Sequence, residues 1–146
     1  MAEHSIHLNI DWPGGRNSVG EMNVGQMTTK VSIPKKMDGP EVGTNPSDML
    51  LGAAGGCYLM TLAAMIERAE LPLQEIGLKS EGIVDIINGV ITYKKIIHRP
   101  TVILTDEATE KERKKLQRII VQADKHCMVS RAVEGNITIE LEPYIR

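Results

Sequence analysis

The sequence predicts an α+β protein in which antiparallel strands and two helices follow one another in the order β-β-β-α-β-β-α-β. Two observations predict this class, and the length of the chain predicts the number of domains. Apolar and polar residues alternate in short segments near both ends of the chain, which is typical of half-buried strands. Two longer segments, one apolar and one charged, carry helix signals. The length of 146 residues suits a single domain over residues 1–146.

The first 33 residues predict three short strands. Alternate positions from Ile6 to Trp12 are apolar, and Pro13-Gly14-Gly15 ends this run. A weaker strand is predicted over residues 16–24, and apolar positions alternate again from Met27 to Ile33. The short spacings between these segments favour an antiparallel meander.

A long apolar helix is predicted from Pro46 to about Ala69. Asn45 is a good N-cap, Pro46 suits the first helical position and Asp48 suits the third. The residues after Asp48 are apolar on every face, so we expect a core helix that is covered on several sides. Three glycines within residues 52–56 each cost about 1 kcal/mol of helix propensity. They favour the close approach of another backbone.

The second half of the chain predicts a hairpin, a charged helix and a last strand. Asn88-Gly89 is a two-residue hairpin signal between strands over about 76–86 and 90–104. Residues 109–125 form a charged helix with one apolar stripe. Cys127 prolongs that stripe if the helix runs on. Alternation from Ile137 to Leu141 predicts the closing strand.

Composition excludes several classes of protein. The chain has 17 Lys and Arg against 19 Asp and Glu, so no basic surface indicates a nucleic-acid partner. Only 3% of residues are aromatic, which argues against base-stacking surfaces. The polar N-terminus lacks the signal-peptide pattern, so we expect a cytoplasmic location. Residues 49–66 reach the length of a membrane span, but three glycines and acidic flanks favour a buried helix and no membrane partner.

The two cysteines, Cys57 and Cys127, are the candidate chemical groups. Both lie on apolar stripes, so they could meet in the fold. Composition alone leaves two interpretations open. Free cysteine usually packs as a small buried hydrophobe. Two neighbouring thiols instead support a cycle in which one is oxidised to sulfenic acid and the other condenses with it to a disulfide.

The histidines do not predict a metal site. His126 lies next to Cys127, but no Cys-x-x-Cys or His-x-x-x-His spacing supplies the three or four ligands that zinc needs. We therefore expect no metal and no cofactor. His4, His7 and His98 are expected on strand surfaces.

Two longer segments carry a family resemblance. Residues 43–57 read GTNPSDMLLGAAGGC, and residues 126–132 read HCMVSRA. Together they resemble the OsmC/Ohr family of osmotically inducible and organic hydroperoxide resistance proteins, in which proline is common where this chain has Met128. The resemblance implies the OsmC-like fold, an intertwined homodimer whose antiparallel sheets wrap around two central helices.

The resemblance also implies an activity, that of a cysteine-based thiol peroxidase acting on organic hydroperoxides. Carried over to this chain, Cys57 is the peroxidatic thiol and Cys127 the resolving thiol, and the two form an intramolecular disulfide. An external dithiol, of lipoyl or thioredoxin type, would reduce that disulfide.

Two further residues follow from the resemblance. The family uses an arginine to hold the thiolate and a glutamate after Asn-Pro to hold that arginine. Arg16 is the candidate arginine, with a solvated turn residue as the alternative, and Arg131 is a second candidate cation. The glutamate position holds Ser47, and Asp48, next in line, has a competing role as a capping carboxylate. This departure keeps open a catalytically weak relative, a redox sensor or a small-ligand binding protein.

Overall fold

The computed structural model describes residues 3–146 and confirms the α+β class. The elements are β1 (Leu8–Asp11), β2 (Gly20–Val24), β3 (Met27–Val31), the 3-10 helix η1 (Lys35–Met37), α1 (Pro46–Arg68), β4 (Leu73–Ile87), β5 (Val90–Leu104), α2 (Glu110–His126), α3 (Met128–Val133), β6 (Thr138–Leu141) and β7 (Tyr144–Ile145). The chain divides into two compact units, one that ends at Met49 and one over Leu50–Arg146. The single domain over residues 1–146 stays a prediction.

The first unit contains the predicted meander. Strand β2 pairs antiparallel with both β1 and β3, so the three strands form one sheet in the order β1-β2-β3. The following loop leads to Asn45, whose Oδ1 accepts the backbone N–H of Asp48 at 3.0 Å. Its Nδ2 donates to the Asp48 carboxylate, also at 3.0 Å. The predicted N-cap of the long helix is therefore confirmed.

The second unit is built on the long β4–β5 hairpin. Asn88 and Gly89 form its turn with positive φ angles of 52° and 78°, as a two-residue turn of this kind requires. The last strand differs from the antiparallel expectation, because β6 pairs parallel to β5. Helices α2 and α3 carry the chain back between these two strands, and such a crossover produces parallel pairing. Strand β7, which was not predicted, also pairs parallel to β5.

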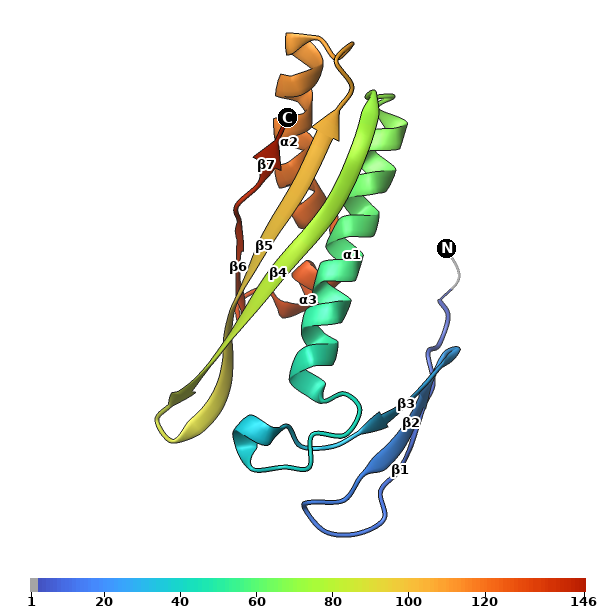
Figure 1. Cartoon of the computed structure of the whole chain (residues 1–146), viewed down its shortest axis with the longest axis vertical. Coiled ribbons are helices and arrows are strands. Elements are labelled where there is room, and N and C mark those ends of the chain that lie inside the picture. The colour runs from blue at the N-terminus through green and yellow to red at the C-terminus, as the bar shows by residue number, and fades with distance from the viewer. Residues whose placement is uncertain (1–2) are drawn as a thin grey trace. The chain divides into compact units, whose positions relative to one another are not determined.

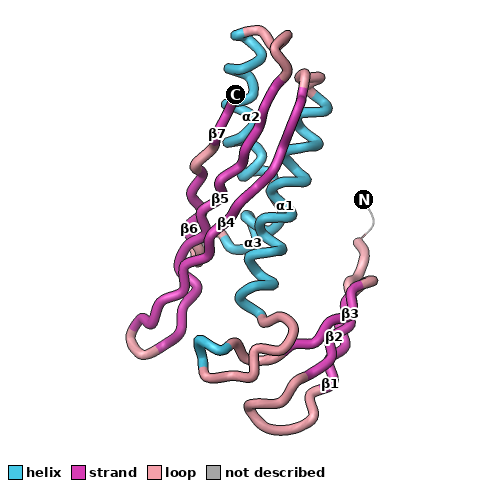
Figure 2. Tube along the Cα trace, in the orientation of Figure 1, coloured by secondary structure: helices cyan, strands magenta, loops and turns pink. Residues whose placement is uncertain are grey.

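Helices α1 and α2 pack against the same face of this sheet (Figures 1 and 2). The core between them holds side chains from α1, β5 and α2, among them Tyr58, Leu62, Ile66, Val102, Leu104, Leu116, Ile119, Ile120 and Ala123. Every second residue of β5 from Ile96 to Leu104 is buried, and Val102 and Leu104 belong to this core. His98 is one of them and is fully buried, so its predicted surface position is wrong. The physical reason is the parity of the strand, which places it on the helix-covered face.

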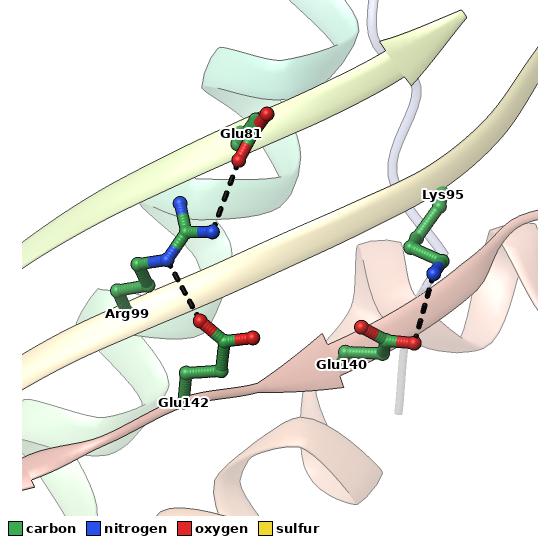
Figure 3. Close-up of polar contacts among 5 residues, drawn as sticks. All are labelled: Glu81, Lys95, Arg99, Glu140 and Glu142. Atoms are coloured by element: carbon green, nitrogen blue, oxygen red, sulfur yellow. Dashed lines mark hydrogen bonds and ion pairs between the residues drawn. The ribbon is translucent and has the colours of Figure 1, made fainter.

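Ion pairs connect neighbouring strands of the same sheet through more exposed residues (Figure 3). Arg99 of β5 donates to Glu81 of β4 at 3.0 Å and to Glu142, just after β6, at 2.9 Å. Lys95 of β5 lies 3.0 Å from Glu140 of β6. Pairs this exposed contribute little to stability individually. Their arrangement matches the register in which β6 lies beside β5.

Helix α1 is covered less than predicted. Its buried residues, Ala54, Gly55, Tyr58, Leu62 and Ile66, lie on one face. By length and composition α1 could cross a membrane, with a mean hydropathy of 1.8 over 18 residues, and 28% of that window is buried. A Cβ at Gly55 would lie 3.4 Å from two β4 side chains, so a sheet rather than another backbone explains this glycine. At Gly52 and Gly56 no atom of the described chain, apart from the neighbouring residues and backbone of α1 itself, lies within 4 Å of such a Cβ.

Candidate thiol site

The site begins where α2 gives way to α3. Cys127 ends α2, with its N–H donating to the Asp124 carbonyl at 3.2 Å. The same residue is the N-cap of α3, because its Sγ accepts the Ser130 N–H at 3.5 Å. Helix α3 was not predicted, since six residues carry too little periodicity to be recognised. Cys127 does extend the apolar stripe of α2, as it is fully buried in the same core cluster as Ala123.

Cys57 reaches this point from the third turn of α1. Both cysteines are free, and Cys57 packs against the buried cluster that holds Cys127, close enough for each thiol to shift the pKa of the other. Cys57 is partly exposed, whereas Cys127 has no exposed surface. The fold therefore brings together the two thiols that the sequence singled out.

The surroundings of the two sulfurs favour opposite protonation states. Burial raises the pKa of Cys57, but hydrogen bonds outweigh it and leave this pKa below its usual value. The donors are the backbone N–H groups of Val129 and Met128 and the Cys127 thiol, with the Thr61 hydroxyl also in reach. That hydroxyl donates its one proton to the Cys57 carbonyl at 2.8 Å, so the amides of α3 are the main donors.

Cys127 stays protonated more readily. Burial raises its pKa, and contact with Ser130, whose N–H donates to the sulfur at 3.5 Å, lowers it only in part. The neighbouring Cys57 sulfur raises it further, because two negative charges so close repel. The surroundings therefore favour loss of the proton at Cys57 and its retention at Cys127.

A polar network continues behind Cys127. The Ser130 hydroxyl donates to Asp124 Oδ1 at 2.7 Å. Tyr58 donates from its hydroxyl to the Ile120 carbonyl at 2.9 Å, and its ring stacks on His98 with the centroids 5.0 Å apart. His98 Nδ1 lies 2.6 Å from Ser80 Oγ, while its Nε2 is buried without a hydrogen-bond partner among the described residues.

Sequence reasoning missed most of this network. His98 could have been found, because it shares its strand parity with the apolar Ile96 and Val102. Ser130 lies inside the HCMVSRA segment but was not assigned a role. Nothing in the sequence distinguishes Asp124 from the other acidic residues of α2.

The remaining predicted residues are described by their own contacts. Arg16, in the first unit, donates to Asn17 at 2.9 Å and to the backbone carbonyls of Asp38 and Met37. Asp48 is engaged with the Asn45 cap. Arg131 and His126 are exposed, on α3 and at the end of α2. Roles for Arg16 and Asp48 toward the Cys57 thiolate stay predictions.

A cavity of about 380 Å³ opens beside Ser130. Asp124, Lys125, Ser130, Arg131, Glu134, Gly135, Asn136, Ile137, Thr138 and Ile139 line it. It gives the Asp124 side chain a route to solvent on the side away from the core. Within residues 3–146, no three His, Cys, Asp or Glu side chains gather as they would around a metal ion.

A family model and two related sequences match most of this chain. The family model described as OsmC-like protein matches residues 38–142. The uncharacterized protein YmaD of Bacillus subtilis is 48% identical over 146 residues, which is 100% of this chain and 97% of YmaD. The uncharacterized protein ACIAD3023 of Acinetobacter baylyi is 27% identical over 88% of this chain and 86% of its own.

Solved structures share the fold at low identity. An organic hydroperoxide resistance protein from Elizabethkingia anophelis has a TM-score of 0.79 at 22% identity, with 99% of each chain covered. The organic hydroperoxide resistance protein OsmC of Legionella pneumophila has a TM-score of 0.78 at 16% identity, also with 99% of each chain covered.

Proposed function

The chain belongs to the OsmC-like protein family, and we propose that it is a cysteine-based thiol peroxidase that reduces organic hydroperoxides. The observation that carries this proposal is the packing of the partly exposed Cys57, whose pKa is lowered by hydrogen bonds, against the cluster that holds the fully buried Cys127. Several proteins of this fold are described as organic hydroperoxide resistance proteins, which supports the choice of substrate class.

The proposed cycle uses both sulfurs. The Cys57 thiolate attacks one oxygen of the hydroperoxide, the O–O bond breaks, and the alkoxide leaves and takes up a proton to become an alcohol. Cys57 is then a sulfenic acid. The Cys127 sulfur attacks the Cys57 sulfur, the Cys127 proton and the sulfenic hydroxide form water, and a disulfide results. An external dithiol of lipoyl or thioredoxin type then reduces the disulfide by exchange.

We also propose that the chain acts as a cytoplasmic homodimer, with no nucleic acid or membrane as partner. Support for the dimer comes from the uncovered face of α1, where Gly52, Gly56 and the 75% exposed Met60 are one helical turn apart. An apolar face with two glycines suits close packing of a second copy. Light scattering after size exclusion should give twice the chain mass, and Met60→Lys should shift the protein toward monomer, whereas the exposed Val121→Lys on α2 should not.

A peroxide assay tests the activity directly. Purified protein should consume cumene hydroperoxide with a lipoyl or thioredoxin-type dithiol as electron donor. Cys57→Ser should abolish consumption, because no thiolate remains to attack the peroxide. Cys127→Ser should reduce one equivalent of peroxide and then stop, because the disulfide is not formed. If wild-type protein consumes no peroxide with either dithiol, the peroxidase proposal is wrong.

The alternative is a weakly catalytic redox sensor or small-ligand binding protein. Two observations favour it. Ser47 stands where the family glutamate would hold an arginine, and Arg16 makes its hydrogen bonds with carbonyls of its own unit. Under this alternative Ser47→Glu should raise a low peroxidase activity. An unchanged activity after that substitution would remove its main support.

A further inference from the structure

We propose that Asp124, acting through the Ser130 hydroxyl, accepts the proton that Cys127 must lose when it attacks Cys57. The inference rests on the proposed roles of the two cysteines and adds the missing base. Ser130 touches the reacting sulfur, whereas Asp124 acts through Ser130 and is therefore a positioning residue.

The need for a base follows from the burial of Cys127. This thiol has no exposed surface, so water does not reach its proton directly. Burial raises its pKa, and this cause persists after Cys57 is oxidised, so the thiolate is scarce at neutral pH. Only the thiolate attacks a second sulfur at a useful rate.

In the reduced protein the Cys127 proton is directed at the Cys57 thiolate. Oxidation of Cys57 removes that negative charge, and the proton loses its acceptor. Ser130 is the next polar residue at the Cys127 sulfur: its N–H donates to that sulfur at 3.5 Å, and its hydroxyl also influences the Cys127 pKa. Its own proton is already donated to Asp124 Oδ1 at 2.7 Å, so its lone pairs are free to accept.

The proton then moves in two short steps, and this path from Cys127 through Ser130 to Asp124 is the proton relay. The Cys127 proton passes to Ser130 Oγ as the Ser130 proton passes to the Asp124 carboxylate. The Cys127 sulfur forms its bond to the Cys57 sulfur, and the bond from Cys57 to its leaving group breaks. With sulfenic acid the leaving hydroxide and the proton held by Asp124 make water. The cavity of about 380 Å³ lets Asp124 exchange its proton with solvent.

Other titratable groups face this point from each packed element: Cys57 and Tyr58 from α1, His98 from β5, and Lys125, Arg131 and Glu134 around the cavity. Burial raises the pKa of Tyr58 and lowers that of His98. Both groups are therefore neutral near pH 7. No hydrogen bond from His98 to Ser130 competes with Asp124 among the described residues.

The test isolates the attack by Cys127 without any peroxide. 5,5′-Dithiobis(2-nitrobenzoate) reacts first with Cys57, which forms a mixed disulfide and releases one coloured thiolate. Cys127 then attacks Cys57 and releases a second. In Asp124→Asn the first release should be unchanged and the second roughly 100-fold slower, since a positioned base contributes about 10²–10⁴-fold. Asparagine still accepts the Ser130 hydrogen bond, so the local structure is retained.

Ser130→Ala should slow the second release in the same way. The pH profile provides a readout that a structural role would not move: the second phase of Asp124→Asn should rise tenfold per pH unit, while the wild type is flatter. Asp106→Asn is the matched control, an exposed residue ahead of α2 and roughly 20 Å along its axis from Asp124. It should behave as wild type.

The outcomes separate the two proposals. If the second release is as fast in Asp124→Asn and Ser130→Ala as in the wild type, the proton relay is wrong and Cys127 remains the resolving thiol. Absence of a second release in the wild type overturns the resolving role and the relay with it. If thermal melting shows that Asp124→Asn does not fold, Ser130→Ala alone decides.

Discussion

The backbone amide of Met128 gives the sharpest test of how the Cys57 thiolate is held. This N–H is one of the donors that keep the pKa of Cys57 low. Proline at this position would delete the N–H. Met128 is the first residue of α3, where proline is well accepted, and Cys127 before it already has the extended ψ of 122° that proline demands. Met128→Pro therefore removes one donor with little change in the backbone.

The size of the effect follows from the hydrogen bond that is lost. A hydrogen bond to a charged group contributes about 1.5–3 kcal/mol, and the lower end applies because Cys57 is partly exposed and keeps the Val129 donor. A loss of about 1.4 kcal/mol raises the pKa of Cys57 and lowers its thiolate fraction about tenfold at low pH. The more basic thiolate is intrinsically about threefold more nucleophilic, so alkylation should slow only about threefold there.

Alkylation of Cys57 by iodoacetamide, followed against pH by mass spectrometry, measures both effects. Met128→Pro should lower the rate on the acidic side, raise the high-pH plateau, and move the midpoint upward. Met128→Ala is the control, because it keeps the N–H and removes only a side chain that is 68% exposed. Equal midpoints for the two variants would refute the assignment of this amide as a thiolate donor.

Three further predictions concern stability and are checked by urea unfolding. Tyr58→Phe should lower the free energy of unfolding by about 1 kcal/mol, because the 2.9 Å hydrogen bond to the Ile120 carbonyl is lost; no change would mean that this bond contributes nothing. The wild type should lose stability as the pH falls through about 6.5, because burial lowers the native pKa of His98 and only the unfolded state then binds the proton. His98→Gln should flatten this pH dependence, and an identical slope in the variant would contradict the role of His98. Leu116→Ala should lower the free energy of unfolding by about 2–5 kcal/mol, since the leucine side chain is fully buried. Arg99→Ala should lower it by less than about 1 kcal/mol, and equal losses in the two variants would contradict the greater contribution of the core.

Local signals were enough to predict most of the second unit. The Asn88-Gly89 turn and the stripe containing Leu116 are decided by neighbouring residues, so the hairpin and α2 could be predicted from the sequence. The parallel pairing of β6 could not, because it depends on where the crossover returns the chain. Helix α3 is held by a cap from the Cys127 sulfur, and its six residues carry no pattern of their own.

The same division holds for the site. The two cysteines stand in recognisable segments, so they could be named from the sequence. Their contact and the donation from the α3 amides arise only when α1 packs against the end of α2. The hydrogen bond from Ser130 to Asp124 depends on the bend from α2 into α3. The burial of His98 is accessible from strand parity, although a single polar residue in an apolar series also suits a surface position.

The cap supplied by Cys127 bears on the choice of mutant for enzymology. Because its sulfur accepts the Ser130 N–H, this residue joins two helices as well as carrying a thiol. A serine hydroxyl is a better capping acceptor, so Cys127→Ser separates chemistry from architecture. Cys127→Ala removes both at once, and the loss of a cap alone costs about 1 kcal/mol. Inactivity of the alanine variant would thus mix two causes, whereas the serine variant reports on the thiol.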